Sequence, residues 1–165
     1  MLKQNEFAQT DIEYMQQALE EAQKAAVLGE VPVGAVIVKD GAVIGRGYNL
    51  REQLRNSLAH AELIAIDEAS RKLNNWRLEG ATLYVTLEPC PMCAGAIVQS
   101  RIKRLVYGAT DAKGGSAGTI VNLVEEERFN HQVDEIVAGV LAEESATMLS
   151  NFFQDIRTKS SYKKA

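Results

Sequence analysis

The chain has 165 residues, 46% of them hydrophobic, and only three prolines, a composition typical of one globular domain. The net charge is −4 and the pI is about 5.3, so the chain lacks the overall basic character of a typical nucleic-acid binder. A nucleic acid could bind only at a local basic surface. No apolar run has the length of a signal peptide or a membrane span, so we expect a soluble, cytoplasmic protein with no membrane partner. We expect a single domain over residues 1–165, with a short polar N-terminus and a basic C-terminal tail.

The first third of the chain is predicted to form a helix and then a β-hairpin. Thr10 and Glu13 have the spacing of a capping box, and apolar side chains then recur at helical spacing as far as Gly29. Residues 33–38 form a short apolar run, and residues 42–48 alternate loosely between apolar and polar. A Lys-Asp-Gly turn between the two runs favours a hairpin.

Helices and strands alternate through the rest of the chain. A helix is expected from His60 to about Lys72, and Trp76, in the next connection, is interpreted as a packing anchor. The other expected elements are strands at 81–87, 104–107 and 135–140, helices at 90 to about 100, 122–129 and 142 to about 157, and a glycine-rich loop at 109–119. This alternation predicts an α/β fold, a three-layer α/β/α sandwich with helices on both faces of a mixed five-stranded sheet.

Two short segments concentrate the metal-binding chemistry of the chain. His60-Ala61-Glu62 and Pro89-Cys90-Pro91-Met92-Cys93 contain one of the two histidines and both cysteines. Zinc binds neutral imidazole and thiolate in a tetrahedral shell, and a catalytic zinc typically keeps three protein ligands and one open position. Cysteines three residues apart share one face of a helical turn, and the intervening proline favours a helix start. The sequence therefore predicts one zinc ion per subunit, bound by His60, Cys90 and Cys93.

Glu62 is predicted to be a proton carrier close to this ion. Residues two apart on a helix point to nearly opposite sides, so His60 and Glu62 can share a cavity only where the helix begins. We therefore expect two helix starts to face each other across one ion, with Glu62 nearby as a non-ligand. Two thiolates cancel the zinc charge, so the bound water is less acidic than in an all-histidine site and needs a nearby base. A carboxylate suits this general acid/base role.

Two other interpretations of these residues remain open. A Cys-x-x-Cys pair is often redox-active or structural, and redox pairs are typical of a thioredoxin-like context. A structural zinc site requires a fourth protein ligand, for which His131 is the remaining nitrogen candidate.

The combination of His-x-Glu with Pro-Cys-x-x-Cys resembles the zinc-dependent nucleoside and nucleobase deaminases of the cytidine deaminase-like superfamily. Within that superfamily, the chain is most similar to the bacterial tRNA-specific adenosine deaminases. The similarity extends over residues 29–38, 59–62, 81–96, 100–108 and 111–118, and includes the double phenylalanine near the C-terminus. One departure is Ser57-Leu58, where the family more often has Pro-Thr before Ala-His, and this puts the detail of that loop in question.

The resemblance implies a hydrolase that edits RNA by converting the wobble adenosine of an arginine tRNA anticodon to inosine. It implies a homodimer, a cytidine deaminase-like fold, zinc held by the three ligands above, and Glu62 as the proton shuttle. It also implies that the backbone amides of Ala61 and Cys90 lie near the metal and that Asn49 hydrogen-bonds the flipped adenosine. Asp111 and Lys113 would contact the neighbouring nucleotides. Phe152 or Phe153 would line the anticodon pocket.

Alternatives remain at the level of function and of single residues. A deaminase of a free base or nucleoside, such as guanine or cytosine, fits the same superfamily, and a non-catalytic, zinc-stabilised RNA-binding module fits the same ligands. Asn49 is also interpretable as a turn residue, Asp111 as a loop cap, and the two phenylalanines as core packing.

Overall fold

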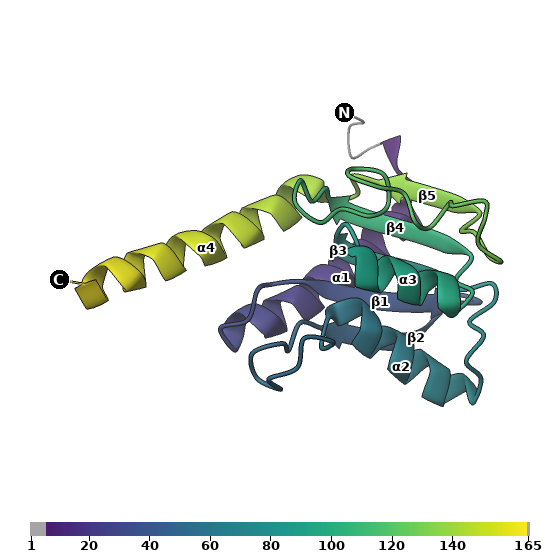
Figure 1. Ribbon diagram of the computed structural model, residues 1–165, viewed down its shortest axis with the longest axis horizontal. Helices are drawn as coiled ribbons and strands as arrows, with labels where there is room; N and C mark the ends of the chain where they lie inside the picture. Colours follow the sequence, from purple (N-terminus) through teal and green to yellow (C-terminus); the bar gives the residue numbers. More distant parts are fainter. Residues whose placement is uncertain (1–5, 165) are drawn as a thin grey trace.

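A mixed sheet of five strands forms the centre of the computed structural model, which describes residues 6–164 (Figure 1). In chain order, the described elements are α1 (Gln9–Val27), β1 (Gly34–Lys39), β2 (Ala42–Tyr48), α2 (Ala61–Leu73), β3 (Thr82–Leu87), α3 (Pro91–Gln99), β4 (Arg104–Ala109), β5 (Glu135–Ala138) and α4 (Ala142–Lys164). The strand order is β2-β1-β3-β4-β5. β1 is antiparallel to both of its neighbours, whereas β3, β4 and β5 run parallel. The predicted α/β/α sandwich is therefore confirmed.

Apolar side chains of the strands divide between two cores, one on each face of the sheet. Helices α2 and α3 cover one face, where Ile37 and Leu83 pack into the larger core. Helix α1 covers the other face, where Val36 and Tyr84 pack with Met15 (Figure 1). Residues adjacent in a strand thus enter opposite cores, as the period of two in a β-strand requires. Helix α4 packs on β4 near its first residues, and the rest of it runs away from the sheet (Figure 1).

Two glycines of β2 allow α2 to lie almost directly on the strand. A Cβ atom at Gly45 would overlap the carbonyl oxygen of Ala65, and one at Gly47 would overlap that of Ala61. Helix α2 also presents small buried residues, Ala61, Ala65 and Ala69, to this face. The close approach fixes the height of the start of α2 above the sheet, which is where His60 lies.

A buried polar cluster joins α1 to the sheet on the other face. The guanidinium of Arg104 donates two hydrogen bonds of 2.7 Å to the Asp11 carboxylate, and the Tyr84 hydroxyl donates a third at 2.8 Å. Arg104 also pairs with Glu135 on β5. Asp11 is buried, so its charge is stabilised by these donors instead of by water.

Several predicted boundaries differ from the structure. The expected capping box is wrong: α1 begins at Gln9, its N-cap is Ala8, and no side chain caps it. Asp11 and Ile12 instead donate their backbone N–H groups to the carbonyl of Ala8, which places Thr10 inside the helix.

The helix predicted at 122–129 is also wrong, because this segment forms turns and a single bridge from Asn122 to Ala117. Its backbone groups are taken by other partners: Leu123 donates to the carbonyl of Ser116, and Val124 accepts from Val133. Helix α4, in contrast, continues to Lys164 instead of ending near residue 157. No glycine or proline interrupts it, and its final lysines suit the negative end of the helix dipole.

Candidate metal centre and active-site pocket

His60, Cys90 and Cys93 form the one group of possible metal ligands of this kind found among residues 6–164, with donor atoms within 4.8 Å of one another. The Nδ1 atom of His60 lies 3.7 Å from Sγ of Cys90 and 3.5 Å from Sγ of Cys93. Zinc bonds of about 2.3 Å to sulfur and about 2.0 Å to nitrogen, at tetrahedral angles, place nitrogen and sulfur about 3.5 Å apart. The three side chains therefore fit a single zinc ion, with a fourth position left for a small ligand.

Two helix starts bring these residues together, as the sequence predicts. His60 is the N-cap residue of α2, and Cys90 is the N-cap residue of α3, with Pro91 in the first turn. Both N-cap residues have extended backbone conformations, and their side chains come together in one group. The unpaired N–H groups and positive dipole ends of two helices thus face one centre and favour thiolate or other negative charge there.

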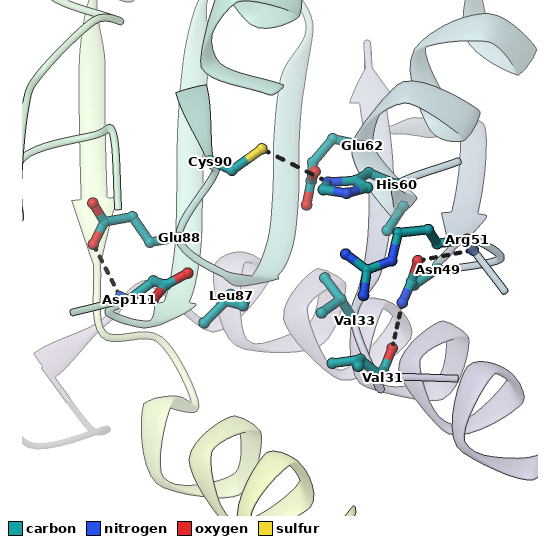
Figure 2. Close-up of a pocket in the computed structure, with 11 residues that line it drawn as sticks. Val31, Val33, Asn49, Arg51, His60, Glu62, Leu87, Glu88, Cys90 and Asp111 are labelled. Atoms are coloured by element: carbon teal, nitrogen blue, oxygen red, sulfur yellow. Dashed lines mark hydrogen bonds between the residues drawn. The ribbon is translucent and has the colours of Figure 1, made fainter. Parts of the chain in front are cut away.

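Glu62 lies in the first turn of α2 and lines the same pocket as His60 and Cys90. Figure 2 shows the three side chains converging at one end of the pocket. Only 3% of Glu62 is exposed, and this burial raises the pKa of its carboxyl to about 7. A carboxyl with a pKa near neutrality can both accept and release a proton at working pH, which is the property a general acid/base requires.

The two cysteines differ in their proton affinity. A hydrogen bond from Cys93, with a further one from His60, lowers the pKa of Cys90 to about 4. The bond to Cys90 and burial raise the pKa of the Cys93 thiol, and the bond to Cys90 raises the pKa of His60. A cluster of groups with strongly shifted pKa values is characteristic of functional sites.

The pocket is open to solvent and lies at the start of α2, beside the group of possible metal ligands. Its lining residues are Val31, Val33, Asn49, Arg51, His60, Ala61, Glu62, Leu87, Glu88, Cys90 and Asp111 (Figure 2). Cys93 lies fully buried at the first turn of α3. The structure thus brings the three ligand candidates, Glu62, Ala61, Asn49 and Asp111 into one site.

Three residues that the resemblance associates with RNA lie outside this lining. Lys113 is exposed in the loop after β4. Phe152 and Phe153 lie on α4 and contact each other edge to face at 5.4 Å, and Phe153 is 45% exposed. The structure therefore does not place these phenylalanines in the core either. Trp76, interpreted from the sequence as a packing anchor, is 52% exposed and lies against the guanidinium of Arg77.

Asn49 and Asp111 each line the pocket and also organise their own loops. The Asn49 amide donates to the carbonyl of Val31 at 3.2 Å and accepts from the N–H of Arg51 at 3.2 Å. Asp111 accepts from the N–H groups of Lys113 at 2.9 Å and Gly114 at 3.2 Å. Both local interpretations, turn residue and loop cap, thus describe real hydrogen bonds, and neither removes the side chain from the pocket.

Sequence reasoning missed Glu88 and the apolar wall formed by Val31, Val33 and Leu87. A signal for Glu88 was available, since a carboxylate stands between an apolar strand and a metal-ligand motif. His131, the candidate for a fourth ligand, instead hydrogen-bonds the carbonyl of Ile102 through Nε2 at 2.8 Å and is not among the grouped ligands.

Comparison with known proteins places the chain in a family. The model of the MafB19-like deaminases matches residues 9–157. A tRNA-specific adenosine deaminase of Bacillus subtilis is 60% identical over 146 residues, which cover 88% of this chain and 90% of that protein. One from Haemophilus influenzae is 49% identical over 156 residues, covering 94% and 90% of the two chains.

A solved structure from work on A-to-I editing by tRNA:A34 deaminases at the wobble position of transfer RNA superposes with a TM-score of 0.79. It is 45% identical in sequence, and the match covers 83% of this chain and 99% of that one. The identity, the coverage and the shared fold agree, and the chain belongs to the MafB19-like deaminase family and, within it, to the tRNA-specific adenosine deaminases.

Proposed function

We propose that this protein hydrolyses the wobble adenosine of a tRNA anticodon to inosine, and that its substrate is an arginine tRNA. The observation that carries this proposal is the buried carboxyl of Glu62 beside a group of one imidazole and two thiols, at the end of a pocket that is open to solvent. The high identity to named tRNA-specific adenosine deaminases supports a tRNA adenosine as the substrate, and the arginine tRNA is proposed from the family resemblance.

His60, Cys90 and Cys93 would hold one zinc ion in each subunit, and the bound ion supplies Lewis-acid activation of a water molecule. Glu62 takes a proton as the water oxygen adds to C6 of the adenine ring, and it delivers protons to the ring nitrogen and the departing amino group. The oxygen replaces the amino group and ammonia leaves. A pKa of about 7 lets the same carboxyl serve in both directions.

The pocket walls position the base for this reaction. Asn49 retains hydrogen-bonding capacity after its two local contacts and can bond the adenine edge. Ala61 lines the pocket at the first position of α2, so its N–H would be available to stabilise developing negative charge together with the helix dipole. Apolar contact with the flipped base comes from Val31, Val33 and Leu87.

RNA outside the pocket would contact the surface around it, including Lys113 and helix α4. The exposed end of α4 carries Arg157, Lys159, Lys163 and Lys164, and no acidic residue follows Asp155. This local cationic surface suits phosphates in a chain whose overall charge is negative. We propose that Phe152 and Phe153 contact the anticodon arm from this helix.

We further propose that the protein is a single-domain homodimer that acts in the cytoplasm. Among residues 6–164, no helix is long and apolar enough to cross a membrane.

The decisive experiment is inosine formation in an arginine tRNA anticodon stem-loop with zinc-loaded protein. Guanine, cytosine and cytidine are incubated in parallel, and Glu62→Gln is the matched inactive variant. Inosine at the wobble position, absent with the variant, is the expected result. Ammonia from a free base with no inosine would replace the tRNA substrate by a small one, and RNA binding without any turnover would indicate a binding module.

A further inference from the structure

Two buried glutamates outside the ligand group hold the walls of the pocket: Glu88 is itself a lining residue, and Glu30 is not. Glu30 follows α1, and Glu88 follows β3; their exposed fractions are 1% and 2%. A buried carboxylate is stable only when donors satisfy its oxygens. In both cases the donors belong to irregular loops, whose backbone N–H groups have no strand or helix partner to satisfy them.

Glu88 holds the loop after β4. Its carboxylate accepts hydrogen bonds from the N–H groups of Asp111 at 3.4 Å, Ala117 at 3.1 Å and Thr119 at 3.2 Å, and a short one from the Thr119 hydroxyl. The next carbonyl, that of Pro89, accepts from Ser116 at 2.9 Å. The loop is thereby folded against the segment that leads into Cys90.

Glu30 holds the loop after β2 in the same way. Both of its oxygens accept from the N–H of Glu52, at 3.0 and 3.1 Å, and one also accepts from Gln53 at 3.1 Å. This loop begins with Asn49 and Arg51, which line the pocket. Figure 2 shows Asn49 and Arg51 on the side of the pocket opposite to Glu88 and Asp111.

We propose that Glu30 and Glu88 are positioning residues that set the width of the substrate pocket, each by fixing one wall through its loop amides. This inference rests on the proposed function for the identity of the substrate, but the anchoring itself does not. Neither carboxylate needs to touch the reacting atoms. Each determines where the residues that contact the nucleotide are placed.

The geometry predicts a distinctive kinetic effect. Glutamine has nearly the shape of glutamate, but it replaces one accepting oxygen by an NH₂ group that faces N–H donors. In Glu88→Gln the loop at 111–119 loosens, while His60, Cys93 and Glu62 keep their places. Because these walls bind the nucleotide and do not carry out proton transfer, we expect KM for the stem-loop RNA to rise about tenfold or more and kcat to change far less.

Amide hydrogen exchange gives a readout that does not depend on RNA. Glu88→Gln should increase exchange at 111–119 and leave 49–53 protected, and Glu30→Gln should do the reverse. Each variant is thus the matched control of the other, and Glu68→Gln, at an exposed position of α2, controls for the loss of one negative charge.

A second pair of variants covers the case in which Glu88→Gln folds poorly. A Cβ atom at Gly115 would overlap the Glu88 carboxylate, so Gly115→Ala displaces the wall while leaving the carboxylate chemistry intact. Thr119→Val removes only the hydroxyl donor. Both should raise KM in the same direction, with zinc content at the wild-type level.

These results separate the two proposals. Wild-type KM in Glu88→Gln, unchanged exchange at 111–119, loss of zinc with the variant, or a fall in kcat alone would overturn the positioning role. If the wild-type protein deaminates no RNA while exchange changes wall by wall as described, the anchoring stands and the proposed substrate is wrong.

Discussion

The Nδ1 atom of His60 lies 3.5 Å from the Sγ atom of Cys93, although 33 residues separate them in the chain. The two residues belong to different helices whose first turns face each other. If His60, Cys90 and Cys93 bind the metal, changing any one of them should remove a ligand without removing a helix. In His60→Ala and Cys90→Ala, we expect zinc bound per subunit to fall strongly, as measured by metal analysis of purified protein. His131→Ala is the control, because His131 is engaged with Ile102, and loss of zinc in that variant would restore the four-ligand structural site.

Glu62→Gln should abolish most turnover while leaving the metal in place. The amide keeps the size of the side chain but cannot accept and return a proton, and general acid/base groups typically contribute about 10²- to 10⁴-fold in rate. We expect kcat to fall by that factor, with zinc content and thermal stability close to wild type. Preserved turnover in a folded, zinc-loaded variant would contradict the proposed mechanism.

Asn49→Ala tests whether this residue contributes more than a turn. The change removes two loop hydrogen bonds and one pocket donor, so we expect deamination to fall about tenfold with normal zinc content. Asn56→Ala is a matched control: Asn56 also accepts from a backbone N–H two residues ahead, that of Leu58, but it is absent from the pocket lining. Equal rates in Asn49→Ala and wild type would assign Asn49 to the turn alone.

Asp11→Asn should destabilise the fold without affecting chemistry, because Asp11 lies on the opposite face of the sheet from α2 and α3. Breaking its paired bonds to Arg104 leaves a partly buried guanidinium without its main partner, and we expect about 2 kcal/mol less unfolding free energy in denaturant titration. Glu20→Gln, at an exposed position on the same helix, should change the unfolding free energy by only about 0.5 kcal/mol or less.

The same pair predicts a pH dependence. Burial alone raises the pKa of Asp11, but hydrogen bonds from Arg104 and Tyr84, with the guanidinium charge, outweigh it and hold the pKa below its ordinary value of 3.8. A lowered pKa in the folded state stabilises the protein above the unfolded pKa, and this contribution disappears as pH falls through the folded value. The stability difference between wild type and Asp11→Asn should thus be constant from pH 7 to about pH 5 and narrow below about pH 4. A gap that stays constant down to pH 3 would exclude the ion pair as its source.

The grouping of His60, Cys90 and Cys93 could be predicted from the sequence because much of it is decided locally. Cys90 and Cys93 share a turn whatever the rest of the chain does, and the angular argument at Glu62 places His60 at a helix start. The sheet was predictable for a related reason, since apolar strands and amphipathic helices alternate along the chain.

Other features depend on contacts between distant segments and left no local signal. The carboxylates of Glu30 and Glu88 find their backbone N–H donors only when two loops fold over them. The sequence near each glutamate does not identify these donors. The capping box predicted at Thr10 failed for a local reason: the helix already begins at Gln9, and the carbonyl of Ala8 accepts the backbone N–H groups of Asp11 and Ile12. Whether Phe152 is buried depends on how α4 leaves the sheet, and helical periodicity does not determine that direction.

The contact between α2 and β2 makes the mutational tolerance of this enzyme uneven. Backbone atoms meet at Gly45 and Gly47, so the separation of helix and strand does not depend on the size of any side chain there. Apolar residues elsewhere in the two cores can exchange for others of similar volume, and evolutionary drift at those positions leaves the imidazole of His60 where it is. A methyl group added at either glycine would overlap a backbone carbonyl oxygen of α2, and the helix could accommodate it only by moving. The added group lifts the start of the helix, where His60 lies, and the candidate site is displaced by a change that adds no charge and removes no functional group.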